Sequence, residues 1–190
     1  MIPTTDYLRI VAANFAALEA AAPQLDAAAD LCVTALRAGG KVIFCGNGGS
    51  AADSQHLAAE LMGRFLMDRT PLAALALTVD TSALTAIGND YGFDEVFARQ
   101  LRGIGRAGDV IIGLSTSGSS RNVVRAFDAA GELGITRIAL TGQAESPMSA
   151  LAELALRVPS RQTNHIQEMH IAIGHIICGI VESRLCSAKP

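Results

Sequence analysis

The chain has 190 residues, of which half are hydrophobic and only 17% are charged, a size that suits one well-buried domain. Its formal net charge of -3 argues against nucleic-acid binding, which usually needs a concentrated basic face. No apolar run approaches the roughly 20 residues that span a bilayer, and the start lacks the basic-then-apolar order of a secretory signal. We therefore expect a cytoplasmic protein with no nucleic-acid or membrane partner, whose apolar helix faces are buried against other subunits.

The cysteines form no CxxC pair, and three of the four sit in apolar surroundings. Structural disulfides are rare in cytosolic proteins, and a buried free thiol is the ordinary state of such a residue. We expect free thiols at Cys32, Cys45, Cys178 and Cys186.

The first third of the chain begins with an alanine-rich stretch, residues 6–36, that predicts one or two helices interrupted near Pro23. Gly39 and Gly40 follow it, as expected just past a helix C-terminus. Residues 41–46 are a short apolar run rich in β-forming residues, and a glycine-rich turn and a helical stretch over 50–65 come next.

The rest of the chain repeats this strand–turn–helix unit. A second strand is expected over 73–79, a short helix over 81–90 opened by Thr81 or Ser82, and a helix near 93–106. The next elements are a strand over 109–114, a serine-rich turn, a helix over 121–134, strands over 136–142 and 154–159, and a long closing helix over 163–186.

Short continuous apolar strands that alternate with helices indicate an α/β fold, with a parallel sheet covered on both faces. We expect a single domain, with an N-terminal helical segment at 1–38 and an α/β core at 39–190. Ligands of such open sheets bind at the carboxyl ends of the strands, where both turns lie.

The first turn, GNGGS at 46–50, runs straight into a helix. Its glycines let the backbone approach a ligand closely, and the free N–H groups of the helix start favour an anion. The turn is neither a dinucleotide-binding fingerprint nor a phosphate loop with lysine. A tight connection with Ser50 as the N-cap explains it equally well.

The second turn, STSGSS at 115–120, has five hydroxyls and a glycine before a helix. An N-cap needs only one hydroxyl, which leaves four unexplained. Amides, hydroxyls and the helix dipole can together surround a phosphate monoester without a cationic side chain. This turn therefore predicts a phosphate site.

Candidates for metal binding and proton transfer lie on two helices. His56 and Glu60 are four apart and share a face, so they can hold one divalent ion, although a surface ion pair is the commoner meaning of that spacing. Gln167 and His175 differ by about 80° around the closing helix and about 12 Å along it, which permits a shared site without establishing it. Glu60 and His175 have the chemistry of the base and acid that an isomerase needs.

Four segments, taken in order and spacing, carry a resemblance: GNGGSAADSQHLAAEL, LTAIGNDYGF, GDVIIGLSTSGSS and IQEMHIAIGHI. In these the chain resembles the sugar isomerase (SIS) domain family and, within it, the bacterial phosphoheptose isomerases. The resemblance implies a flavodoxin-like five-stranded sheet and a homotetramer with active sites at subunit interfaces. It also implies conversion of sedoheptulose 7-phosphate to D-glycero-D-manno-heptose 7-phosphate through an enediol, for bacterial heptose biosynthesis.

The resemblance also implies roles for individual residues. One Zn²⁺ per subunit would be held by His56, Glu60, Gln167 and His175, with Glu60 also as the base and His175 as the general acid. The phosphate would bind at Ser115, Ser117 and Ser120, with Thr116 close by. The rest of the substrate would contact Asn47, Gly48, Ser50, Glu60, Asp90 and Gln167. Asn164 stands where some members have an aspartate. His165 and His170 match no functional position, so we expect these two histidines to be structural or solvent-facing.

Two other functions share parts of these motifs. Initiator-associating proteins of bacterial replication resemble the chain in SAADSQH and IQEMH and act by binding a protein partner, but such binders typically lack Glu60 and His175. A regulatory sugar-phosphate sensor would need an attached DNA-binding or catalytic domain, for which 190 residues leave no room. The presence of Glu60 and His175 favours the enzyme.

Overall fold

A computed structural model describes residues 2–186 of the chain and is built on one five-stranded parallel sheet in the order β2-β1-β3-β4-β5. The pairing register sets Gly46 beside Leu114 and Ser115 beside Thr141, so the two predicted turns leave the same edge of the sheet. The strands are β1 (Val42–Gly46), β2 (Ala74–Ala76), β3 (Val110–Ser115), β4 (Thr136–Thr141) and β5 (Leu154–Arg157). All five expected strands are present, and β2 is shorter than the predicted 73–79.

The helices follow the predicted order, with one addition. Pro23 lies in the first turn of α2, where its missing N–H leaves no hydrogen bond unmade, so the N-terminal segment divides into two helices. The unpredicted element is the five-residue α7. The full set is α1 (Thr4–Leu18), α2 (Ala22–Arg37), α3 (Gly49–Met62), α4 (Thr81–Tyr91), α5 (Val96–Ile104), α6 (Arg121–Leu133), α7 (Pro147–Leu151) and α8 (Thr163–Cys186), with 3₁₀ turns at Glu19–Ala21 and Phe93–Glu95.

Two expected helix caps are wrong. The N-cap of α3 is Gly48 rather than Ser50, because the chain turns into the helix at Gly48, with φ of 57°, and Ser50 is already inside the first turn. The N-cap of α4 is Asp80 rather than Thr81 or Ser82, because the Asp80 carboxylate accepts a hydrogen bond from the Ala83 amide at 2.9 Å.

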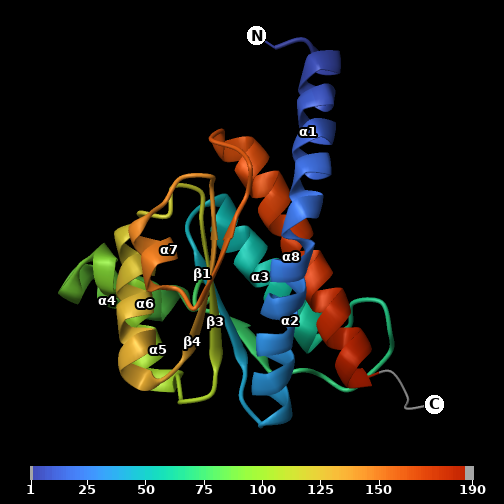
Figure 1. Cartoon of the computed structure of the whole chain (residues 1–190). Helices are drawn as coiled ribbons and strands as arrows, with labels where there is room; N and C mark the ends of the chain where they lie inside the picture. Colours follow the sequence, from blue (N-terminus) through green and yellow to red (C-terminus); the bar gives the residue numbers. More distant parts are fainter. Residues whose placement is uncertain (1, 187–190) are drawn as a thin grey trace.

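Helices cover both faces of the sheet, and alternate residues of each strand pack against them. Val42 and Phe44 of β1 face a cluster formed with α2, α3 and α8, whereas Ile43 and Cys45 face a cluster formed with α5 and α6. Figure 1 shows these two layers on opposite sides of the sheet, with α1 extending beyond the body of the molecule. The expected flavodoxin-like α/β arrangement is confirmed.

Helix α8 is central to this arrangement. Within residues 2–186 it is the one helix long and apolar enough to span a membrane by length and composition. It packs against α1, α2 and α3, so its apolar faces are those of a core helix. Three cysteines are free and buried, as expected, and burial raises the pKa of each thiol to about 12: Cys32, Cys45 and Cys178.

Candidate active site

The two turns that follow β1 and β3 are joined by a pair of amides. Asn47 of the first turn and Asn122 of α6 each donate to the other's side-chain oxygen at 2.8 Å. Asn122 is buried, with 3% of its surface exposed. Asn47 was predicted from the sequence and Asn122 was not, because its signal there is no more than an asparagine in the first turn of the helix after the serines.

The glycines of the first turn make room for a side chain from α8. Gly48 adopts a positive φ that favours glycine. A Cβ atom on Gly49 would lie 1.9 Å from Nε2 of Gln167, so only glycine at this position lets the Gln167 amide reach the turn. Ser50 is buried behind the turn, against Gly46. The fold thus brings Gln167 to Gly49, although these residues lie more than a hundred positions apart.

Three of the predicted metal ligands converge. Nε2 of His56 lies 2.9 Å from Nε2 of His175 and 3.2 Å from Oε1 of Glu60. One donor atom from each of the three lies within 4.8 Å of the other two. His56 and Glu60 come from α3 at the predicted spacing of four, and His175 comes from α8.

This donor set fits a zinc ion. Tetrahedral zinc with bonds of about 2.0–2.1 Å holds its ligand atoms roughly 3.3 Å apart. The two separations from His56 Nε2, 2.9 Å to His175 and 3.2 Å to Glu60, are close to this value. The His56 side chain is 48% exposed and that of Glu60 is 19% exposed, so the group opens to solvent and to a substrate. Two imidazoles and a carboxylate also match the N and O ligands that zinc prefers.

Gln167 lies near the two histidines and next to Asp53, a residue that was not predicted from the sequence. Asp53 is on α3 one turn before His56 and interacts with the Gln167 side chain. Burial raises the pKa of Asp53, and Gln167, His56 and His175 partly offset the rise. Within residues 2–186 the Oδ2 atom of Asp53 is buried without a hydrogen-bond partner. The role of Gln167 as a fourth ligand stays a prediction.

The serine turn is compact and rich in hydroxyls that point at one another. Oγ of Ser115 lies 3.0 Å from Oγ of Ser120, and Oγ of Ser119 lies 3.0 Å from Oγ of Ser117. Gly118 has a φ of 65°, and a Cβ atom there would lie 2.1 Å from Oγ of Ser146. The carbonyl of Thr116 accepts from the Gly142 amide at 3.2 Å, which ties the turn to the end of β4.

The turn opens α6 without a side-chain cap. The amides of Val123 and Val124 donate to the Ser120 carbonyl, while the first amides of any helix have no intrahelical partner. The amides that precede Val123 and the surrounding hydroxyls therefore make this turn a candidate anion site.

One predicted residue stands apart from the rest. Asp90 lies at the exposed end of α4, where its carboxylate accepts a hydrogen bond from Asn89 at 2.8 Å. Among residues 2–186 no described contact joins Asp90 to either turn or to the converging histidines. Its contact with substrate stays a prediction.

His165 and His170 are both buried, so the solvent-facing alternative is wrong. Nδ1 of His165 lies 2.9 Å from Glu168, which also accepts a hydrogen bond from Tyr7 at 2.5 Å. Asn164 donates to the Tyr7 hydroxyl at 2.8 Å. These contacts attach α1 to the start of α8, which is a structural role for His165 and Asn164.

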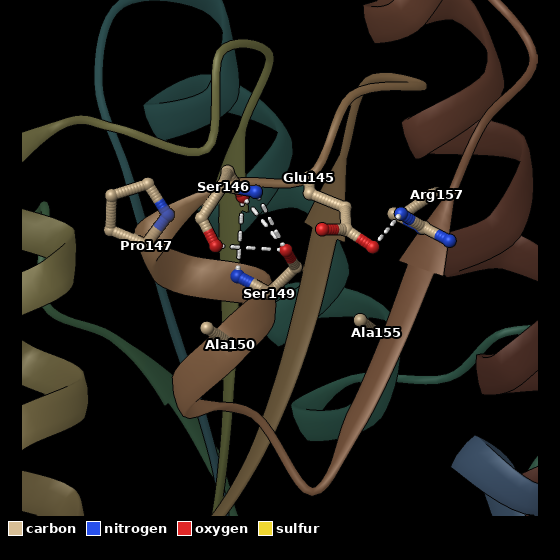
Figure 2. A pocket seen from close by; sticks show the side chains of 7 residues that line it. All are labelled: Glu145, Ser146, Pro147, Ser149, Ala150, Ala155 and Arg157. Carbon is tan, nitrogen blue, oxygen red and sulfur yellow. Dashed lines mark hydrogen bonds and ion pairs between the residues drawn. The ribbon is translucent and has the colours of Figure 1, made fainter.

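A hollow of about 750 Å³ lies elsewhere, between α7 and the edge strand β5. Figure 2 shows Glu145 and Arg157 as an ion pair there and the Ser146–Ser149 capping box that starts α7. None of the predicted site residues lines it, so size alone does not identify the active site. Its lining is Glu145, Ser146, Pro147, Ser149, Ala150, Ala155 and Arg157.

The sequence and fold of this chain are similar to those of known proteins. The SIS domain family model matches residues 6–142. A phosphoheptose isomerase from Akkermansia muciniphila is 55% identical over 175 residues, 92% of this chain and 93% of that protein. One from Rhodospirillum rubrum is 58% identical over 166 residues, 87% of this chain and 88% of that protein. The solved structure of the phosphoheptose isomerase from Neisseria gonorrhoeae superimposes with a TM-score of 0.89 at 45% identity, covering 94% of this chain and 96% of that one.

The chain therefore belongs to the SIS domain family. Within that family its similarity along most of its length is to the phosphoheptose isomerases. The family resemblance drawn from the four sequence segments is confirmed.

Proposed function

We propose that this protein converts sedoheptulose 7-phosphate to D-glycero-D-manno-heptose 7-phosphate, an aldose–ketose isomerisation of heptose biosynthesis. Its relatives are enzymes named as isomerases of a phosphorylated heptose, and the similarity spans most of both chains. The observation that carries the proposal is the convergence of Glu60 and His56 of α3, the helix that follows the first turn, with His175 of α8. A non-catalytic SIS binder has no need of that group.

The proton transfers can be assigned to two side chains. The Glu60 carboxylate removes a proton from C1 of the ketose, and the electron pair of that C–H bond forms the C1–C2 double bond of the enediol. His175 gives a proton to the former carbonyl oxygen at C2. In the second half Glu60 returns its proton to C2, and His175 accepts the hydroxyl proton from the oxygen on C1, so both groups regain their starting states.

The phosphate end of the substrate belongs at Ser115, Thr116, Ser117 and Ser120. The Ser115 and Ser120 hydroxyls already lie 3.0 Å apart at the start of α6, and the Ser117 hydroxyl lies 3.0 Å from that of Ser119. A phosphate there accepts from these hydroxyls and from the first amides of the helix, which fixes the sugar chain relative to Glu60. The rest of the sugar would contact Asn47, Gly48, Ser50 and Asp90.

The proposed cofactor is one Zn²⁺ per subunit, held by His56, Glu60, Gln167 and His175. Bound zinc would polarise the oxygens at C1 and C2 of the substrate. Gln167 offers only a neutral amide oxygen, so affinity rests mainly on the imidazoles and the carboxylate. Imidazole binds a metal only when neutral, so zinc binding weakens as the solution is acidified.

The zinc proposal has a direct test. Purified protein is expected to contain about one zinc per chain, to lose activity with a strong chelator and to regain it with added zinc. His175→Ala should bind zinc poorly, whereas Gln167→Ala should retain more of it. Fully active protein that contains no stoichiometric divalent metal in elemental analysis would contradict the proposal.

The assembly that we propose is a homotetramer in the cytoplasm, with active sites at subunit interfaces. Large apolar side chains are exposed on α1 and α8, at Leu8, Phe15 and Ile176. Tyr91 and Phe93 are exposed beside Asp90 on the other side of the sheet. Burying such patches between copies accounts for the low charge fraction, and it offers a way for Asp90 to reach a site on a neighbouring chain.

The isomerase function itself is tested with the substrate. Protein incubated with sedoheptulose 7-phosphate is expected to produce an aldose phosphate, seen by NMR as a new anomeric proton signal. Sedoheptulose without phosphate is the matched control and should react far more slowly, because it cannot use the serine turn. Zinc-loaded protein that leaves the phosphorylated ketose unchanged would contradict the proposed function.

A further inference from the structure

A second cluster of polar groups lies at the far end of α3 and α8, away from the substrate-binding turns. Glu182 of α8 is buried, with 1% of its surface exposed. Its carboxylate accepts hydrogen bonds from three successive backbone amides, Phe65 at 3.0 Å, Leu66 at 2.7 Å and Met67 at 3.0 Å. Burial alone would raise the pKa of Glu182, but these amides and Arg69 outweigh it and hold the pKa below its usual range.

The partner of Glu182 is equally buried and reaches α3. Arg69 Nε donates to Glu182 at 3.0 Å, and the side chains are 4% and 2% exposed. The rest of the guanidinium donates to backbone carbonyls of Glu60 at 2.8 Å, Leu61 at 2.8 Å and Gly63 at 3.1 Å. These carbonyls belong to the end of α3, where a helix leaves its last carbonyls unpaired. Arg69 therefore caps the helical turn that carries Glu60.

The loop 63–69, which ends at Arg69, also contacts the His175 ring. The Phe65 ring stacks on the His175 ring, with centroids 5.7 Å apart and planes inclined by 22°. Phe65 packs next to Gly179 on the same helix, 3.3 Å from the place of a Cβ atom there. His175, Gly179 and Glu182 are spaced by four and three residues, so one face of α8 presents all three to this loop.

We infer that the Arg69–Glu182 pair is a positioning device for Glu60 and His175. It fixes the last turn of α3 and the loop 63–69 against α8, and the loop holds Phe65 against the His175 ring. The donor atoms of α3 and α8 then meet within 4.8 Å. A buried ion pair is a weak stabiliser compared with a well-packed apolar pair, so its value here lies in the geometry that it imposes.

The inference rests on the proposed function for the roles of Glu60 and His175. Its test distinguishes a failure of the inference from a failure of the proposed function. Glu182→Gln keeps the size of the side chain and removes its charge. The matched control is Asp109→Asn, since Asp109 is the buried partner of Lys41 at 2.6 Å and also accepts backbone amides, but lies at the start of β3. Both variants lose a buried charge pair and should be destabilised against urea.

Two readouts distinguish positioning from stability. Glu182→Gln is expected to raise the zinc dissociation constant at least tenfold in competition with a chromophoric chelator, whereas Asp109→Asn should change it less than twofold. In metal-free protein, the NMR contact between the Phe65 and His175 rings should be lost in Glu182→Gln and kept in Asp109→Asn. A Glu182→Gln protein with wild-type zinc affinity and an intact ring contact would overturn the inference, as would an equal loss of zinc affinity in Asp109→Asn.

Two further results complete the test. If wild-type protein binds no zinc, the cofactor proposal fails, and the ring contact in metal-free protein alone decides the positioning role. If Glu182→Gln does not fold, Phe65→Leu tests the same path with the ion pair intact. It is expected to weaken zinc binding about threefold or more, and unchanged affinity in that variant would overturn the inference.

Discussion

The two roles that we propose for His175, zinc ligand and general acid, would use different ring nitrogens. Its Nε2 faces Nε2 of His56 at 2.9 Å, a separation at which one imidazole donates a hydrogen bond to the other. Zinc held by these two nitrogens would replace the shared hydrogen. The proposed acid role of His175 would then fall to Nδ1.

The serine hydroxyls should each contribute to phosphate binding. Ser117→Ala and Ser120→Ala are each expected to weaken binding of sedoheptulose 7-phosphate by roughly 1–3 kcal/mol, because each removes a hydrogen bond to a charged group. Calorimetry in the absence of turnover, with zinc removed, measures this. Thr34→Val is the control, since Thr34 is on α2 and its hydroxyl donates to the Asp30 carbonyl. Unchanged affinity in both serine variants would place the phosphate elsewhere, at the first turn.

At single positions the sequence identifies chemistry better than it identifies contacts. The i, i+4 spacing of His56 and Glu60 was visible, because both lie on one helix. Their approach to His175 depends on how α3 packs against α8, which no local pattern specifies. Asp53 and Asn122 were missed for the same reason, since each gains its meaning from a partner far along the chain.

The elements themselves were largely predictable, because the strands are uniformly apolar and the helices long. Strand β2 is shorter than its apolar run, since only Ala74–Ala76 pairs with β1. Helix α7 has five residues, too few for a helical periodicity to appear. The cap at Gly48 could not be predicted from the sequence, because it depends on a backbone conformation. The Arg69–Glu182 pair could not be predicted either, because it connects a loop to a helix more than a hundred residues away.

Helix α8 contains a histidine that should make stability depend on pH. His170 is fully buried, and burial lowers its pKa to about 4. Between the usual histidine value and pH 4 the unfolded chain binds a proton that the folded chain does not. Stability is therefore lost as pH falls from about 6.5 to 4, by about 1.4 kcal/mol per pH unit and on the order of 3 kcal/mol in total.

This contribution can be isolated by difference. Urea unfolding of wild type and His170→Leu should be compared at several pH values, because carboxylates common to both proteins cancel in the difference. Whatever the absolute stability of the variant, the wild type should lose about 3 kcal/mol more than the variant on acidification. Parallel pH profiles would show that His170 does not titrate on unfolding.

The whole molecule has apolar surface on both sides of the sheet. A groove of about 270 Å³ between α1, α2 and α8 is lined largely by apolar side chains, including Phe15, Leu25 and Ile176. Because such surface is covered in stable oligomers, we expect light scattering to give a mass near four times the 19.7 kDa of one chain. A stable monomer at micromolar concentration would contradict the tetramer and the interface-built active sites.

The claim that Glu60 moves a proton through an enediol is tested most directly by hydrogen exchange with solvent. In D₂O the wild-type protein should incorporate deuterium at C1 of sedoheptulose 7-phosphate and at C2 of the aldose product, measured by NMR. Glu60→Gln keeps the shape of the side chain but cannot accept the proton, so exchange and product formation should fall by on the order of a hundredfold or more. Folded Glu60→Gln protein, loaded with zinc, that exchanges deuterium at the wild-type rate would contradict the mechanism.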